Sequence, residues 1–287
     1  MVDTLLASLT DGLLIGVVYG IAAMGLTLIF GVMNVINLAH GPIMALGMFG
    51  VYLLFTQFGM NPYLALIPVG FFGLILGIVI YAVAVNRVID APHLSSLLAT
   101  FSVNMIIIGL GTALFTTTFR NVDYSSLGTL TLGPITVPLT RLVSALAALL
   151  VTGLLYLFLQ RTRLGKYVRA VANNRTSAGL VGIPSTRVLA FSFGLGSALA
   201  TIAGGLIAIS LPFTILSGST YELKSFVIVV LGGLGNPVGA LIGGLVLGLI
   251  EGVVPVFMKT TWVPVLEYVL FVLILLVRPQ GLLGAKR

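Results

Sequence analysis

Long runs of apolar residues occupy most of this 287-residue chain and limit what it can fold into. A helix of about 20 apolar residues is long enough to cross the hydrocarbon core of a membrane, which is about 30 Å thick. Within lipid, every backbone polar group needs a partner in the protein, and a helix provides these partners by itself. The apolar runs cover residues 12–32, 41–58, 62–85, 95–116, 142–159, 188–210, 225–256 and 265–277. The sequence predicts an all-α fold, a polytopic transmembrane helical bundle forming a single domain over residues 1–287.

Two segments depart from this simple pattern. The run at 225–256 is too long for one crossing and contains GGLGNP at 232–237, where glycine and proline interrupt a helix. We expect two helices there, the first short and re-entrant, so that the chain crosses the membrane eight to ten times. The segment 117–141 contains the β-prone stretch LTLGPITVPLT. It predicts a short hairpin or an ordered loop outside the bilayer.

The composition excludes several classes of protein. Only 7% of the residues are charged, against about 25% in soluble domains, so water is not the solvent of most of the surface. The absence of cysteine excludes disulfides and thiolate chemistry, and two histidines are too few for a His-rich metal site. The chain has no P-loop, H-E-x-x-H or G-x-S-x-G motif. We therefore expect no enzyme, no resident cofactor or metal and no nucleic-acid partner.

One polar stretch, 160–187, carries six basic residues and no acid. They are Arg161, Arg163, Lys166, Arg169, Arg175 and Arg187. By the positive-inside rule this stretch is cytoplasmic. It follows that 86–94 and the C-terminal tail are also inside, whereas 117–141 and the N-terminus, which has no signal-peptide pattern, are outside.

The same stretch has the pattern of two short helices. The first lies around 167–171, Asn173-Asn174 breaks it, and the second runs to Leu180 and ends at Gly182. A helix pair larger than a connection requires is a surface that an intracellular protein could hold. The alternative is a solvated loop held down by anionic membrane lipid.

Polar residues inside apolar runs are candidates for function, because burying them without partners is costly. Asn34, Asn37 and His40 cluster before Gly41-Pro42, which we expect to interrupt a helix. They either line a translocation path or only cap the helix ends. Asn104 lies within a run and contacts either a neighbouring helix or substrate.

The acids divide into two groups. Glu251 lies deep in an apolar run, where it faces the path, a partner subunit or the membrane interface, whereas Glu222 and Glu267 are expected at the interface. Glycines at small-residue spacing, including Gly12, Gly16 and Gly20, predict close packing of helices. No internal repeat is evident.

Four stretches carry a family resemblance. They are GLLIGVVYGIAAMGLTLIFGVMNVINLAHG, RTRLGKYVRAVANNRTSAGLVGIPSTRV, VVLGGLGNPVGALIGGLVLGLIEG and RPQGLLG. Through them the chain resembles, nearly from end to end, the permease subunits of branched-chain amino acid ABC importers, the LivH branch of the LivH/LivM family. Urea and short-chain amide permeases share much of this pattern. Two positions differ from many relatives: Pro42, where an acid often follows His-Gly, and Gly109-Leu110-Gly111, where Gln-Asn often occurs.

The resemblance implies a plasma-membrane (inner-membrane) importer with several partners. These are a second, LivM-like permease subunit, two cytoplasmic ATP-binding subunits and an extracytoplasmic amino-acid-binding protein. In that family the basic middle loop docks on the ATPase. The expected coupling residues are Arg163, Gly165, Lys166, Arg169, Ala170 and Gly182, and the expected path residues are Asn34, Asn37, His40, Asn104 and Glu251.

Two interpretations outside this family remain open from the residues alone. An ion-coupled secondary transporter would need intramembrane carboxylates as ion ligands, and only Glu251 clearly qualifies. A structural or channel-like membrane protein would not need so large a cytoplasmic loop.

Overall fold

The computed structural model describes residues 2–124, 127–132, 135–278 and 280–283, and it is helical almost throughout. The helices that follow the predicted runs are α1 (Val2–Met33), α2 (His40–Phe58), α3 (Pro62–Ile80), α4 (His93–Phe115), α5 (Leu139–Arg161), α8 (Ser185–Ser210), α9 (Ser217–Gly232), α10 (Pro237–Phe257) and α11 (Trp262–Val277). A π-helical turn, η1 (Tyr81–Val85), continues α3. The predicted all-α helical bundle is confirmed.

Seven of these helices are long and apolar enough to cross a membrane: α1, α2, α3 with η1, α4, α5, α8 and α10. α9 and α11, with 16 residues each, are shorter than these seven. The predicted break at 232–237 is confirmed. α9 ends at Gly232 and α10 begins at Pro237, where the Asn236 side chain accepts hydrogen bonds from the N–H groups of Val238 and Gly239, both at 3.1 Å.

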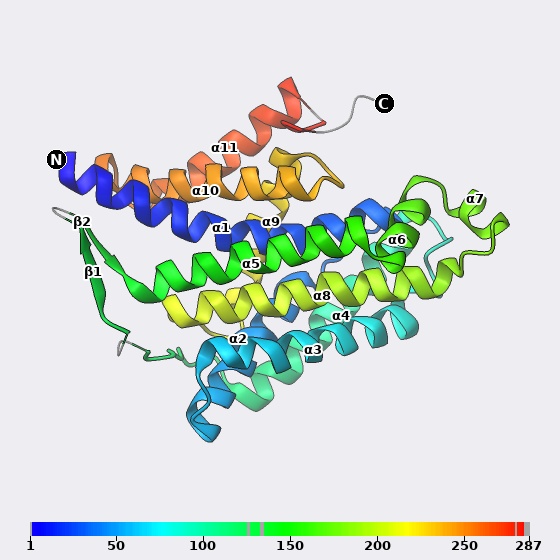
Figure 1. Cartoon of the computed structure of the whole chain (residues 1–287), viewed down its shortest axis with the longest axis horizontal. Helices are drawn as coiled ribbons and strands as arrows, with labels where there is room; N and C mark the ends of the chain where they lie inside the picture. Colours follow the sequence, from blue (N-terminus) through cyan, green and yellow to red (C-terminus); the bar gives the residue numbers. More distant parts are fainter. Residues whose placement is uncertain (1, 125–126, 133–134, 279, 284–287) are drawn as a thin grey trace.

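The two ends of the bundle carry different elements (Figure 1). One end holds the N-terminus and an antiparallel hairpin of β1 (Thr129–Leu132) and β2 (Ile135–Pro138), as predicted for 117–141. The opposite end holds α6 (Arg163–Asn173), α7 (Arg175–Leu180) and the C-terminal segment. An ion pair of 2.6 Å between Arg175 and Asp90 joins α7 to the loop after η1. The relative sidedness expected from the charges is therefore present in the fold.

Glycines let the central helices approach until their backbones touch. Gly12 and Gly16 on α1 face Gly248 and Gly244 on α10, and a Cβ at any of them would overlap backbone of the other helix. On the other side of the bundle, Gly73 and Gly77 of α3 leave room for Thr201 and Ser197 of α8. Such small-residue interfaces drive helix association in lipid, where apolar side chains gain little from leaving the solvent. The predicted packing role of these glycines is confirmed.

The packing pattern reveals a repeat that the sequence does not show. α1 packs along α10 as α8 packs along α3, and α2 contacts α8 as α9 contacts α1. The equivalent helices also meet each other reciprocally, α1 and α8 at Gly25 and Gly196, and α2 and α9 at Gly41 and Gly218. Because α1 and α8 run in opposite directions, α1–α3 and α8–α10 form an inverted pair.

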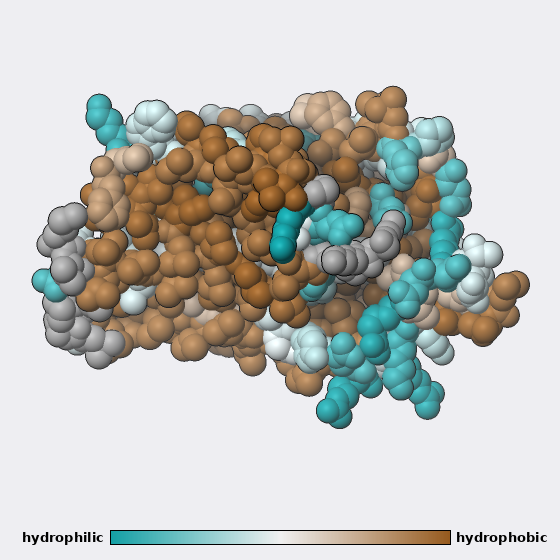
Figure 2. Space-filling model, turned by 90° about the horizontal axis from the view of Figure 1, so that it is seen from above, coloured by the Kyte–Doolittle hydropathy of each residue, from teal (hydrophilic) through white to brown (hydrophobic). Residues whose placement is uncertain are grey.

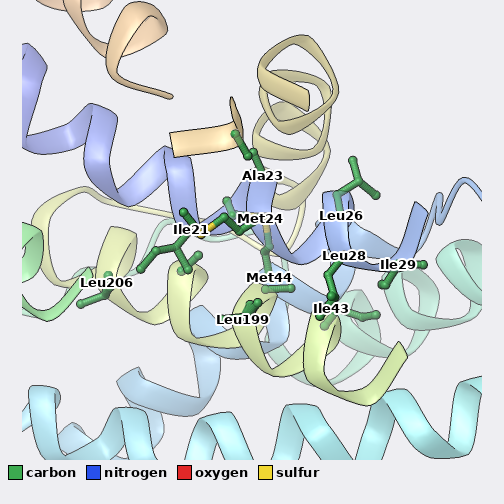
Figure 3. Packing of buried hydrophobic residues seen from close by; sticks show 14 of the residues in the cluster. Ile21, Ala23, Met24, Leu26, Leu28, Ile29, Ile43, Met44, Leu199 and Leu206 are labelled. Atoms are coloured by element: carbon green, nitrogen blue, oxygen red, sulfur yellow. The ribbon is translucent and has the colours of Figure 1, made fainter. Parts of the chain in front are cut away.

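The core lies where these two halves meet. Figure 3 shows Ile21, Met24 and Leu28 of α1 packed with Ile43 and Met44 of α2 and with Leu199 and Leu206 of α8. Apolar side chains on α3, α4 and α11, by contrast, remain largely exposed, as expected for helices that face lipid or another subunit.

Candidate transport site and cytoplasmic loop

The first polar cluster lies at a break between α1 and α2. α1 ends at Met33, and Asn34 follows with a φ of 53°, in the left-handed region that few residues other than glycine adopt. Residues 35–39 then lead back into the bundle, and α2 begins at His40. The break thus precedes Gly41-Pro42, and the expectation that this pair interrupts the helix is wrong. Pro42 lies in the first turn of α2, where a missing N–H breaks no helical hydrogen bond.

Asn37, His40 and Asn104 hold this break together. His40 lies fully buried with Nε2 2.9 Å from the Ala22 carbonyl of α1, and the Asn37 side chain accepts a hydrogen bond from the Ala39 N–H at 3.1 Å. From α4, Asn104 donates to the Leu38 carbonyl at 2.6 Å. Thr100 donates to the Ile36 carbonyl at 3.2 Å. These bonds satisfy backbone groups that the break leaves without helical partners.

Each of the three site residues also keeps one polar atom free. Nδ2 of Asn37, Nδ1 of His40 and Oδ1 of Asn104 are buried and have no hydrogen-bond partner in the described chain. Buried polar atoms are rarely left unpaired in proteins, so these three atoms are available for a bound molecule or water.

Asn34 is separated from that cluster. Its side chain is exposed and lines a cavity of about 400 Å³ outside the cluster. His93, Ser96 and Leu97, at the start of α4, line the same cavity. Asn34 is close to Asn37 and His40 along the chain, which is why the three were predicted to cluster. The turn at Asn34, with its φ of 53°, instead places this residue outside the cluster.

The acids gather around one cation. Lys224 of α9 forms an ion pair with Glu251 of α10, and its ammonium lies 5.0 Å from the centre of the Tyr19 ring. Glu267 of α11 is 2% exposed and interacts electrostatically with the same lysine. Glu222 is 6% exposed and lies against the Gly41 backbone. Both Glu222 and Glu267 are therefore enclosed by the bundle instead of lying on its surface.

Lys224 and Glu222 were missed as site candidates because the apolar run appeared to begin at residue 225. The actual helix begins at Ser217, so both side chains lie within it. No hydropathy signal marked them, because the first half of the helix, SGSTYELK at 217–224, is mostly small and polar.

The basic stretch folds as the sequence predicts, into α6 and α7. Thr162 caps α6 by accepting from the Gly165 N–H at 2.9 Å, and Asn174 caps α7 by accepting from the Ser177 N–H at 2.9 Å. The chain leaves α7 through Gly182, which has a φ of 82°. As expected, Asn174 lies at a break: it follows the last residue of α6 and is the N-cap of α7.

The two faces of α6 differ. Gly165, Val168 and Val171 are buried, and a Cβ at Gly165 would overlap the carbonyls at the end of α5. Arg163 and Lys166 are exposed, and Ala170 is half-buried. In Figure 2 hydrophilic residues gather at this end of the molecule, whereas hydrophobic residues cover its length. The buried face of α6 thus fixes the loop against α5, and its other face exposes basic side chains.

A second cavity, of about 350 Å³, lies beneath α6. It is enclosed by α1, α5, α6 and the start of α10, and Arg169 and Asn236 contribute to its lining. Arg169 therefore belongs to this cavity as well as to the exposed loop. No group of three or more His, Cys, Asp or Glu residues that could hold a metal ion occurs in the described ranges.

Comparison with known proteins covers nearly the whole chain. Residues 8–277 match the family described as "Branched-chain amino acid transport system / permease component". The chain is 30% identical to the "High-affinity branched-chain amino acid transport system permease protein LivH" of Salmonella typhimurium, with 97% of this chain and 95% of the relative aligned. It is 27% identical to the corresponding protein BraD of Pseudomonas aeruginosa over the same shares.

A solved structure shares the fold. "PsaBC from Streptococcus pneumoniae in complex with Fab" superposes with a TM-score of 0.51 at 17% identity, covering 94% of this chain and 92% of that one. The chain belongs to the family of permease components of branched-chain amino acid transport systems, as a multi-pass protein of the plasma membrane.

Proposed function

We propose that this chain is the transmembrane permease subunit of an ABC importer for branched-chain and other hydrophobic amino acids. The observation that carries the proposal is the match to LivH along nearly the whole of both chains. The chain supplies the path and docking surface. A second, LivM-like permease subunit, two cytoplasmic ATP-binding subunits and an extracytoplasmic amino-acid-binding protein complete the transporter.

The cluster at the α1–α2 break supports a role in the path. A zwitterionic amino acid needs hydrogen bonds for its ends and apolar walls for its side chain. The free atoms of Asn37, His40 and Asn104 offer both donors and acceptors at a broken helix, the arrangement in which transporters bind substrates near the middle of the membrane. Asn34 would act separately, at the neighbouring cavity beside His93.

The α6–α7 pair supports a role in coupling. Gly165 fixes α6 against α5, and the exposed Arg163 and Lys166 give the ATPase a basic surface. Ala170 and Gly182 set the shape of the loop, and the exposed Arg169 also borders the cavity beneath α6. A force applied to α7 would reach the loop after η1 through the Arg175–Asp90 ion pair.

The contacts of Glu251 favour this proposal over ion-coupled transport. An ion-coupled transporter needs carboxylates that are free to bind the ion, whereas Glu251 is engaged by Lys224. Glu251 is thus better explained as part of a charge cluster that joins α9, α10 and α11.

Uptake measurements test the proposal directly. In cells that lack their own branched-chain importer, the chain expressed with its ATPase and binding protein should restore uptake of labelled leucine. Unlabelled isoleucine and valine should compete, whereas urea and acetamide should not. Competition by urea or acetamide with none by valine would instead identify a urea or amide permease.

The role of the break is tested by normalising uptake to the amount of protein in the membrane. Asn37→Ala and His40→Ala should leave protein amount near normal and reduce leucine uptake per molecule about tenfold, as expected for the loss of a hydrogen bond to a charged group. Unchanged uptake per molecule in both variants would show that these residues only hold the helix ends together.

A further inference from the structure

The cavity beneath α6 has mainly apolar walls and a single charged side chain. Apolar side chains form most of its lining, among them Leu28, Leu155 and Leu241 of three spanning helices. Arg169 is the one charged residue in that lining, and none of the described residues that line it is acidic. The cavity is therefore suited to an anion that carries an aliphatic chain, because its one charged side chain is a cation and most of its walls are apolar.

Two side chains in the cavity lack partners. Thr27 of α1 is fully buried, and its hydroxyl has no hydrogen-bond partner in the described chain. Arg169 forms no ion pair or side-chain hydrogen bond with any residue in the described ranges, although a guanidinium can donate five. The buried hydroxyl of Thr27 without a partner indicates a polar group that is bound there, and the exposed Arg169 supplies the one charge of the lining.

The position of the cavity indicates where its occupant comes from. It lies at the end of the bundle that holds α6, α7 and the C-terminal segment, which the charge bias assigns to the cytoplasm. Tyr156 of α5 and Val238 of α10, on its rim, are 56% and 50% exposed on the outside of the spanning helices. The space is thus bordered by exposed apolar surface of the spanning helices.

We propose that this cavity binds an anionic phospholipid of the cytoplasmic leaflet, with its phosphate at Arg169 and an acyl chain along the walls of α1, α5 and α10. Thr27 lies one turn of α1 deeper than Gly31, so its hydroxyl is placed to donate to an ester carbonyl beneath the phosphate. Phosphate and guanidinium match in charge and geometry. The lipid would hold α6 against the spanning helices.

Native mass spectrometry of the purified full-length chain tests this binding. The delipidated protein is titrated separately with dioleoyl phosphatidylglycerol and dioleoyl phosphatidylcholine. We expect tighter binding of the first lipid. Arg169→Gln should weaken it about tenfold, the loss expected for a hydrogen bond to a charged group, and Thr27→Val should weaken it less. The matched control is Arg187→Gln, which removes an exposed arginine outside the cavity lining and should leave the affinity unchanged.

Three results of the binding experiments would overturn the proposal. Equal losses in Arg169→Gln and Arg187→Gln would indicate general charge attraction, and equal binding of both lipids would exclude recognition of the anion. Displacement of the lipid by millimolar hexanoate would identify a free aliphatic carboxylate as the occupant. To guard against misfolding of a variant, phosphatidylglycerol with a photoreactive acyl chain is cross-linked to the unaltered protein. Labelling should fall on peptides of α1, α5 and α10, and labelling confined to α3 and α4 would contradict the proposal.

Discussion

Individual charged residues inside the bundle act mainly on one another. Lys224 lies between Glu251 and the rings of Tyr19 and Tyr221, with Glu267 close enough to interact. A buried ion pair adds little net stability compared with apolar residues, but removing one partner leaves an uncompensated charge. The cluster thus holds α9 against α10 and α11, because exposing any one of these charged side chains to lipid without its partner would be costly.

Replacing Lys224 tests this view. Lys224→Met should lower the free energy of unfolding by about 3 kcal/mol, because Glu267 remains buried and Glu251 partly buried without their cation. Thermal unfolding of the purified protein in detergent measures the effect. The double variant Lys224→Met/Glu251→Gln should recover much of the loss. A single variant that unfolds at the same temperature as the unaltered protein would show that the cluster does not stabilise the bundle.

Single residues were also the level at which the sequence was least informative. Hydropathy placed Lys224 and Glu222 outside the helix because a pattern of apolar residues cannot show that two charges neutralise each other within it. The break at 34–39 was assigned to Gly41-Pro42, because the left-handed turn that starts it occurs at Asn34, without glycine. Asn37, His40 and Asn104 stand out in the sequence because polar residues inside apolar runs are rare, and the structure shows that all three are buried.

At the scale of helices, the sequence was more informative. The breaks before Pro237 and Asn174 follow from residues that stop or cap helices, and the short pair α6–α7 follows from local pattern. The inverted relation between α1–α3 and α8–α10 could not be predicted, because it rests on which small residues meet across helices. Such contacts join positions that are more than 100 residues apart, as for Gly25 and Gly196.

The α1–α10 interface provides a prediction at this scale. Gly248→Ala should reduce stability by about 1–3 kcal/mol, because the added methyl group overlaps the backbone of Gly12 and Gly16 and forces the two helices apart. The matched control is Gly153→Ala on α5, where a Cβ meets no atom within 4 Å in the described chain. The unfolding temperature should fall in Gly248→Ala and stay near that of the unaltered protein in Gly153→Ala. If both are unchanged, close approach of α1 and α10 is not what holds the bundle together.

At the scale of the whole molecule, the proposed function requires one orientation in the membrane. The chain has no cysteine, so single cysteines at Thr176 on α7 and Thr129 on β1 can be labelled without background. In intact cells an impermeant thiol reagent should label Thr129→Cys and leave Thr176→Cys unlabelled until the membrane is opened. Labelling of Thr176→Cys in intact cells would contradict the sidedness derived from the six basic residues at 160–187.

The central claim is that this chain carries branched-chain amino acids and that ATP hydrolysis by other subunits drives the movement. The most direct measurement is leucine uptake into proteoliposomes that contain the complete transporter, with ATP inside and binding protein outside. We predict uptake that requires hydrolysable ATP, persists when ion gradients are collapsed, and fails when α6 is displaced by Gly165→Leu, which has no room against α5. Uptake that continues without ATP hydrolysis and stops when the ion gradients are collapsed would contradict the account.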